Sequence, residues 1–441
     1  MKFSKSMLAG VAATLTVIGF AAYYMSSHDG SFEFASQSKK KTDRPLELTE
    51  AKSKSAKTAD ETQIMMNDPA IHQAWGLKKS DAARAWEVSQ GSKKIVVAVI
   101  DTGADVKHED IANNYWTNPG EIGFDAKGKN KSTNGVDDDG DGFVDDVNGW
   151  NFVSNNNDLT DNHGHGTHIA GIIGAEAGNN KGVAGISPQV SLMILKYYDP
   201  KVPATDNLKN TVNAIRYAVK MKAHIINYSG GGTEFSQEEH DAIEEARKAG
   251  ILVVAAAGNE RSNSDKHKYY PADYGLTNII SVTAIDPSTE VLASSNYGTE
   301  TVDIAAPGQN ILWTLPNNTY GYMTGTSQAT AFVTGAAVLV MAHKEQYQAE
   351  DVKKYILATG ESQQSLIAKC RTSRQLNLFK ALTVLDSGIS VAGVVDANDV
   401  KTAALGGVDQ NMAQSQAARE VSGFGKALMQ NLESSSLQKK N

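Results

Sequence analysis

Residues 95–103 have the sequence Ile-Val-Val-Ala-Val-Ile-Asp-Thr-Gly. The six apolar residues run without interruption, and five of them are β-branched, which is typical of a strand buried on both faces of a sheet. The run ends in an aspartate, Asp101. In open α/β folds the ligand site lies at the carboxyl ends of the parallel strands. This segment therefore predicts a central parallel strand that delivers Asp101 to the edge where such a site forms.

The segments on either side repeat the pattern. Residues 251–257 form a similar strand candidate, and residues 224–227 and 279–284 form weaker ones. Helical patterns occur at 166–177, 206–221, 236–249 and 326–342. Strands that alternate with helices over some 300 residues predict an α/β fold around a mostly parallel sheet. We place this domain at 67–384.

Composition limits the classes of protein that this chain can represent. The chain has 441 residues, 41% of them hydrophobic, and a formal net charge of −8, which disfavours a general nucleic-acid binder. Its single cysteine, Cys370, excludes an intramolecular disulfide. Because Cys370 is remote from every histidine motif, we interpret it as a structural or surface thiol, not a nucleophile.

The two ends of the chain differ from the middle. Residues 1–25 combine Lys2 and Lys5 with an apolar run over 7–24, which predicts either a cleaved signal peptide or an uncleaved membrane anchor. Residues 26–66 are polar and lysine-rich, as in a linker or short pro-segment, and 385–441 resemble a flexible or partly helical tail. We therefore expect an exported protein that is secreted or periplasmic, or that its N-terminal segment anchors to the membrane.

Residues 162–171, Asn-His-Gly-His-Gly-Thr-His-Ile-Ala-Gly, place three histidines at the start of an expected helix. Histidine is the usual general base near neutral pH, and His165 is our candidate. A zinc site is the alternative. It is disfavoured because neither His-Glu-x-x-His nor neighbouring cysteines are present.

Two further segments supply the remaining groups of a hydrolytic site. Ser327, in Thr-Gly-Thr-Ser-Gln-Ala, precedes an apolar helix, whose unpaired N–H groups would stabilise an anionic intermediate. Asn259 follows a buried strand and could donate to the same oxyanion, while Asp101 would orient the imidazole of His165. Taken singly, Ser327 and Asp101 could be ordinary helix caps and Asn259 a turn residue.

The order Asp, His, Asn, Ser removes much of that ambiguity, because it differs from the orders of chymotrypsin-type and α/β-hydrolase enzymes. Asp101-Thr102-Gly103, His165-Gly166-Thr167-His168 and Gly325-Thr326-Ser327 resemble the three signatures of the subtilase family. Further matches, from about residue 67 to residue 377, are Ala257-Gly258-Asn259, Tyr270-Pro271-Ala272 and Asp303-Ile304-Ala305-Ala306-Pro307-Gly308.

The resemblance implies a three-layer α/β/α domain and an endopeptidase acting on proteins or peptides through an acyl-enzyme. It also implies that Ser229, Gly230 and Gly231 pair with the substrate backbone as an added strand. Ala256, Ala257 and Gly258 would form the other wall of the specificity pocket.

The chain departs from the family pattern at several positions. Gln328 replaces a common Met, Ala331 a Pro and Phe332 a His. Gly230 replaces a residue that is often bulky, and Tyr269 one that is often small. We expect a shallow specificity pocket that disfavours large aromatic side chains. Residues 26–66 are also shorter than the inhibitor-like pro-domain of many relatives.

Residues 137–146, Asp-Asp-Asp-Gly-Asp-Gly-Phe-Val-Asp-Asp, match the first half of a calcium loop. Six aspartates within ten residues repel one another unless a cation binds, so we expect structural Ca²⁺. A solvated acidic loop is the alternative, because Asn148 stands where an EF-hand has its bidentate glutamate. The candidate ligands are Asp137, Asp139, Asp141, Phe143 through its carbonyl, Asp145 and Asp146.

Two rival functions follow from other classes of protein. One is a catalytically inactive subtilase fold that serves as a calcium-stabilised binding or scaffolding module. The other is a lipase-type esterase, which conflicts with the motif order.

Overall fold

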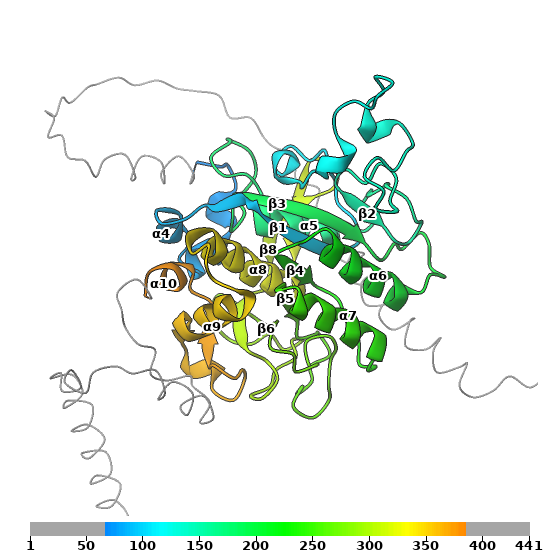
Figure 1. Ribbon diagram of the computed structural model, residues 1–441. Helices are drawn as coiled ribbons and strands as arrows, with labels where there is room; N and C mark the ends of the chain where they lie inside the picture. The colour runs from blue at the N-terminus through cyan, green and yellow to red at the C-terminus, as the bar shows by residue number, and fades with distance from the viewer. Residues whose placement is uncertain (1–66, 385–441) are drawn as a thin grey trace, which may run out of the picture. The chain divides into compact units, whose positions relative to one another are not determined.

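The computed structural model describes residues 67–384, which form a sheet of nine strands with helices on both faces (Figure 1). The strand order is β10-β11-β7-β6-β5-β4-β1-β3-β2, and every neighbouring pair is parallel except β10 with β11. The strands are β1 (Gly91–Asp101), β2 (Gly149–Asn151), β3 (Gln189–Lys196), β4 (Ile225–Tyr228), β5 (Leu252–Ala256), β6 (Ile279–Ile285), β7 (Ile304–Pro307), β10 (Glu361–Ser362) and β11 (Arg374–Gln375). A separate antiparallel pair joins β8 (Ile311–Leu315) to β9 (Thr319–Met323).

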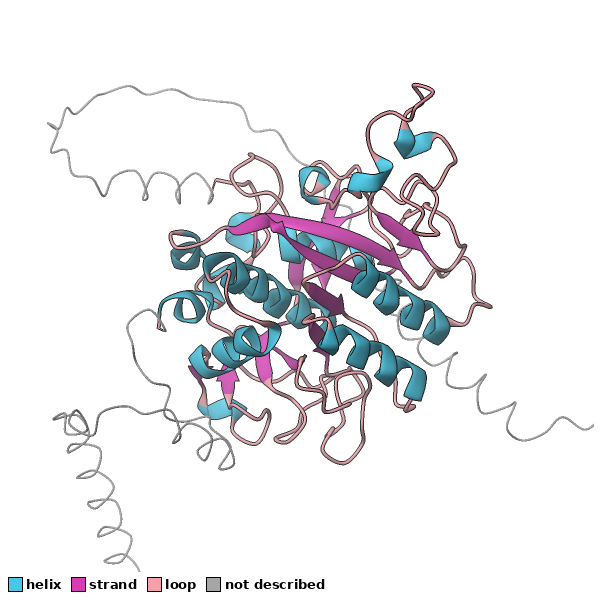
Figure 2. Ribbon diagram, in the orientation of Figure 1, coloured by secondary structure: helices cyan, strands magenta, loops and turns pink. Residues whose placement is uncertain are grey.

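The helices divide between the two faces of the sheet (Figure 2). Along β1, Val97 and Val99 join a buried cluster with the central helices, whereas Ala98 and Ile100 join a second cluster with α6 and α7. This alternation produces three layers, as the resemblance implied. The helices are α3 (Trp75–Lys79), α4 (Ala82–Trp86), α5 (His165–Gly174), α6 (Asn207–Lys220), α7 (Gln237–Lys248), α8 (Thr326–His343), α9 (Ala349–Thr359) and α10 (Leu378–Thr383).

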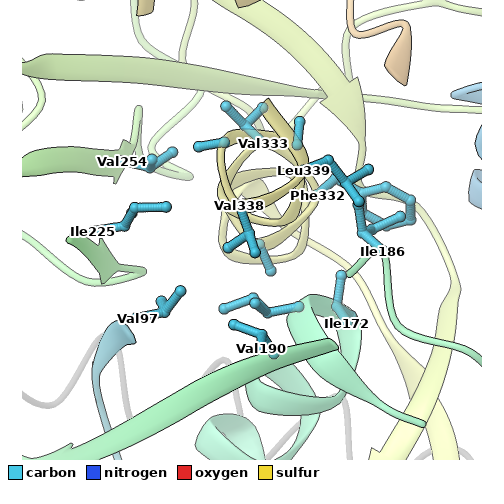
Figure 3. Packing of buried hydrophobic residues seen from close by; sticks show 14 of the residues in the cluster. Val97, Ile172, Ile186, Val190, Ile225, Val254, Phe332, Val333, Val338 and Leu339 are labelled. Atoms are coloured by element: carbon cyan, nitrogen blue, oxygen red, sulfur yellow. The ribbon is translucent and has the colours of Figure 1, made fainter. Parts of the chain in front are cut away.

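Helix α8 runs through the larger cluster. Its apolar side chains, among them Phe332, Val338 and Leu339, are fully buried and surrounded by residues of the sheet and of α5 (Figure 3). A helix that is apolar all round is stable only where protein covers every face. The first turn of α8 is therefore held firmly against the sheet.

The strands and helices expected from the sequence are present, with shifted ends. Helices α6 and α7 begin after Asp206 and Ser236, whose side chains accept hydrogen bonds from the N–H groups of Lys209 and Glu239. Helix α5 ends at Gly174 and not at 177, because Ala175 already has an extended backbone (φ −61°, ψ 145°).

Within residues 67–384 there is no helix that combines the length and the apolar character needed to cross a bilayer. The expected signal or anchor (1–25), the lysine-rich segment (26–66) and the tail (385–441) lie outside the described residues.

Candidate active site

The candidate residues meet where the parallel strands end. Asp101 is the last residue of β1, Ser229 follows β4, and Asn259 lies three residues beyond β5. His165 opens α5 and Ser327 lies in the first turn of α8. Strand ends and helix N-termini thus supply the acidic group, the imidazole, the hydroxyl and the amide.

Asp101 and His165 are joined by a short hydrogen bond, 2.7 Å between His165 Nδ1 and Asp101 Oδ1. Asp101 is 2% exposed, and its Oδ1 also accepts the N–H of Thr102 at 2.8 Å. Burial alone would lower the pKa of His165, but the Asp101 carboxylate outweighs it and the pKa is raised. Because a carboxylate only accepts, Nδ1 carries the proton and Nε2 is left as the basic nitrogen.

Gly166, the residue after His165, allows α5 to lie close to the turn that follows β1. A Cβ on Gly166 would collide with the carbonyl oxygen of Gly103 and would lie 3.2 Å from Asp101 Cβ. The N–H of Gly166 instead donates to Thr102 Oγ1 at 2.9 Å. The glycine of the His-Gly-Thr sequence thus lets α5 pack directly against the turn that follows β1.

The Ser327 hydroxyl is buried and donates to the carbonyl oxygen of Ser229 at 2.9 Å. In the described part of the chain no hydrogen bond joins Ser327 to His165. Such contacts are often loose without substrate.

Asn259 is exposed, and its Oδ1 accepts the backbone N–H of Thr326 at 3.0 Å and the Thr326 hydroxyl at 3.3 Å. These bonds fix the amide so that its NH₂ group is turned away from Thr326. Among residues 67–384 that NH₂ group has no acceptor, so it is available to a ligand beside Ser327. The sequence contained Thr326 within Gly-Thr-Ser but gave no sign of this orienting role.

Comparison with known proteins assigns the chain to a family. Residues 92–380 match the subtilase family. The chain belongs to that family. It is similar to the major intracellular serine protease of Bacillus subtilis (37% identity over 273 residues, 62% of this chain and 76% of that protein). It is also similar to thermitase of Thermoactinomyces vulgaris (34% over 275 residues, 62% and 84%). Against subtilisin-like protease 2 of Plasmodium falciparum the identity is 31% over 350 residues, 77% of this chain but 23% of that protein.

The subtilase is therefore a serine-type peptidase. Its two other motif histidines are not part of the Asp101–His165 pair. Nε2 of His168 lies 3.0 Å from the carbonyl oxygen of Ile311 and 3.2 Å from that of Gly321, and burial lowers the pKa of His168 to about 3. His163 has its ring centroid 6.1 Å from that of His165, and burial lowers its pKa as well.

Tyr269 lies between the segments that we predicted to form the two walls of the cleft. A Cβ on Gly231 would lie 2.7 Å from Tyr269 Cε1, and a Cβ on Gly258 would lie 2.9 Å from Tyr269 Cδ2. Ala256 and Ala257 are both 2% exposed. The tyrosine ring thus takes up space beside both glycines.

The acidic loop of this subtilase gathers carboxylates from two segments. Oxygen atoms of Glu121, Asp137 and Asp139 lie within 4.8 Å of one another, an arrangement that could hold a metal ion. Glu121 is fully buried, and burial followed by the charges of Asp139 and Asp138 raises its pKa. Within the described range, Glu121 Oε2 is buried without a hydrogen-bond partner, and a bound cation would satisfy it. Asp141 Oδ2 is also buried without a hydrogen bond there, but it lies 4.0 Å from Lys220 Nζ in an ion pair.

The other predicted ligands of the loop make different side-chain contacts. Asp146 accepts from Asn118 Nδ2 at 2.7 Å and from the Tyr217 hydroxyl, and burial raises its pKa to about 6. Asp145 accepts the N–H of Gly135 at 3.0 Å. The ring of Phe143 packs edge-on against Trp150, Phe152 and Tyr217. These contacts anchor the loop to the sheet and α6.

Glu121 was missed by the sequence analysis. It closes a short 3-10 turn, Pro119–Glu121, sixteen residues before Asp137. Its Oε1 accepts the N–H of Asp138 at 2.7 Å, which brings the two segments together.

Proposed function

We propose that this subtilase is an exported endopeptidase that hydrolyses peptide bonds with Asp101, His165 and Ser327, assisted by Asn259. The hydrogen bond between Asp101 and His165, at the strand ends beside the first turn of α8, is the observation that carries the proposal. It matches the orienting carboxylate and imidazole that nucleophilic serine chemistry requires.

In the first step Ser327 Oγ leaves the Ser229 carbonyl and attacks the scissile carbonyl carbon. Nε2 of His165 takes the hydroxyl proton, and Asp101 stabilises the imidazolium that results. The tetrahedral oxyanion receives hydrogen bonds from Asn259 Nδ2 and the backbone N–H of Ser327, with the N-terminal end of α8 adding positive potential.

In the second step the carbon–nitrogen bond breaks. His165 donates its proton to the departing amine, which leaves the acyl group on Ser327 Oγ. Water, deprotonated by the same Nε2, attacks the ester and releases the acid product while Ser327 regains its proton. The same two donors stabilise both oxyanions.

The substrate would lie against the segment after β4. Over the described residues the backbone N–H groups of Gly230 and Gly231 donate to no protein acceptor. Such free N–H groups are expected of a segment with which an extended peptide pairs as an added strand. Gly232, in contrast, is already paired with Tyr270, by hydrogen bonds of 2.9 and 2.7 Å. The Tyr269 ring beside Gly231 and Gly258 supports a shallow specificity pocket.

Export rests on residues 1–25, with their two lysines and apolar run. Two relatives are named as intracellular proteases, so the family by itself does not assign a compartment. Fractionation of a tagged full-length protein tests the proposal: it should be found outside the cytoplasmic fraction, in medium, periplasm or membrane.

Structural Ca²⁺ rests on Glu121, Asp137 and Asp139, whose oxygen atoms converge, whereas Asp141 pairs with Lys220. All offer the hard oxygen ligands that this ion prefers. The site is built from two chain segments, so an ion there would hold the turn 119–121 against the acidic loop and would take no part in bond cleavage.

Labelling with a fluorophosphonate probe tests the nucleophile. Wild type should be labelled and should cleave casein, and Ser327→Ala should do neither. Ser365→Ala is the matched control, because its hydroxyl also donates to a backbone carbonyl, that of Thr289 at 2.7 Å. A folded wild-type protein that neither labels nor cleaves would support the inactive scaffold instead. Labelling combined with hydrolysis of esters but not of casein would support the esterase.

A further inference from the structure

We propose that Asp161 is a positioning residue that holds Asp101 and His165 in the relative position that their hydrogen bond requires. This inference rests on the proposed function. Asp161 lies four residues before His165 and is 7% exposed. It does not contact the imidazole by a hydrogen bond. It acts through the two segments that carry the acid and the base.

The Asp161 carboxylate accepts five hydrogen bonds. Oδ1 accepts from the Thr102 hydroxyl (2.8 Å), the N–H of His163 (3.0 Å) and the N–H of Gly164 (2.8 Å). Oδ2 accepts from the backbone N–H (2.9 Å) and the hydroxyl (2.7 Å) of Thr167. Both oxygens are therefore saturated by donors on either side of His165 and by one donor beside Asp101.

Thr102 connects this carboxylate to the acid of the pair. Its N–H donates to Asp101 Oδ1 at 2.8 Å, and its hydroxyl accepts the N–H of Gly166 at 2.9 Å while donating to Asp161. One hydroxyl thus joins the residue after Asp101, the residue after His165 and the Asp161 carboxylate. Any shift of Asp161 displaces both segments together.

An asparagine could not replace this carboxylate without conflict. All five partners are donors, so an NH₂ group at either oxygen position would face N–H or O–H groups. The negative charge also matters for the general base. Burial lowers the pKa of His165, Asp101 raises it most strongly, and Asp161 adds a smaller increase. Burial lowers the pKa values of the neighbouring His163 and His168.

Asp265 offers a matched control. Its carboxylate also accepts five hydrogen bonds, from the N–H and hydroxyl groups of Thr299 (2.8 and 3.1 Å) and Thr301 (3.1 and 2.9 Å) and from the N–H of Glu300 (2.9 Å). It lies in the connection between β5 and β6, six residues after Asn259, but it makes no hydrogen bond to Asp101, His165, Asn259 or Ser327 in the described part of the chain. Asp265→Asn therefore reproduces the loss of a saturated carboxylate that is not hydrogen-bonded to the segments around Asp101 and His165.

The test compares kcat, KM and the pH profile of Asp161→Asn and Asp265→Asn on one peptide substrate. We expect Asp161→Asn to lose roughly 100-fold in kcat with little change in KM, as for misplaced reacting groups. The acid limb of its profile should move to lower pH. Asp265→Asn should retain the wild-type kcat and profile even if it melts earlier.

Thr102→Val is the second variant, for the case that Asp161→Asn does not fold. It removes the shared hydroxyl but keeps the charge, so kcat should fall while the acid limb stays in place. A wild-type kcat and acid limb in folded Asp161→Asn, or a wild-type kcat in Thr102→Val, would overturn the role of Asp161. Activity that survives in Ser327→Ala would overturn the proposed function itself, so the two failures are distinguishable.

Discussion

The ring of Tyr269 packs directly against the backbone of Gly258, where a Cβ would lie 2.9 Å from Tyr269 Cδ2. On its other side the same ring meets Gly231, where a Cβ would lie 2.7 Å from Cε1. Glycine at both positions gives the tyrosine its room. We propose that the tyrosine fills volume that a large substrate side chain would need between the two segments.

We therefore predict that Tyr269→Ala deepens the specificity pocket. In a peptide library, wild type should disfavour Phe and Trp before the scissile bond, and the variant should cleave after them at least about 10-fold faster relative to small residues. Tyr355→Ala, at a half-buried tyrosine of α9, is the control and should keep the wild-type preference. A wild-type enzyme that already prefers Phe or Trp would refute the shallow pocket.

The raised pKa of His165 predicts the acid limb of the activity profile. The imidazole is an active base only when neutral, so activity should fall as the pH drops through a pKa above the ordinary value of 6.5. Asp101→Asn removes the main group that raises this pKa. The limb should therefore move to lower pH, and kcat should fall by roughly 10⁴-fold because the imidazole tautomer is no longer fixed.

The matched control for that variant is Asp241→Asn, at an exposed aspartate of α7. It should leave both kcat and the limb unchanged. An acid limb that stays in place in Asp101→Asn would show that a group other than the Asp101–His165 pair sets it.

The sequence predicted this pair because each member sits at a strongly patterned boundary. Asp101 ends a continuous apolar strand and His165 opens a helix rich in glycine, so the α/β topology alone brings them to one edge. The resting bond of Ser327 to the Ser229 carbonyl has no such signal. It depends on a side-chain rotamer, which one bond rotation changes.

Glu121 shows why half of the acidic site could not be predicted. Asp137 and Asp139 lie in a dense local motif, whereas Glu121 belongs to a separate turn and meets them only through tertiary packing. Asp161 was likewise passed over, since its five donors come from positions 102 to 167 and no spacing rule joins them. Contacts within one element follow from patterning, and contacts between loops do not.

Chelation of the proposed Ca²⁺ should destabilise the subtilase. Carboxylates that a bound ion neutralises would repel one another once it is chelated, and binding at 100 times Kd stabilises a fold by about 2.7 kcal/mol. We predict that EDTA lowers the melting temperature of Ser327→Ala protein, used to prevent autolysis, by several degrees, and that added Ca²⁺ restores it. A melting temperature that EDTA leaves unmoved would count against structural Ca²⁺.

Glu121→Gln distinguishes calcium binding at Glu121 from a general effect of losing one negative charge. The substitution keeps the size of the side chain but removes one of the converging charges, so titration calorimetry should show weaker Ca²⁺ binding and a smaller response to EDTA. Glu109→Gln, at an exposed glutamate, is the control and should bind as wild type does. Equal calcium affinity in the two variants would place the ion elsewhere.

Buried His168 predicts acid sensitivity of the folded state. Its folded pKa is about 3, against 6.5 for the free side chain, so below pH 6.5 the unfolded chain binds the extra proton. The stability that neutral His168 contributes is complete above pH 6.5 and is lost as the pH falls towards 3. From pH 7 to pH 5 this group alone should lower the free energy of unfolding by about 2 kcal/mol.

Urea unfolding of Ser327→Ala protein at pH 7 and pH 5, in excess Ca²⁺, measures that loss. His168→Gln should show a smaller loss between the two pH values, because glutamine can donate to the Ile311 and Gly321 carbonyls but does not titrate. His72→Gln, at an exposed histidine, should keep the full pH dependence. If His168→Gln loses as much stability as wild type on acidification, the acid sensitivity arises from other groups and His168 is protonated in the folded state.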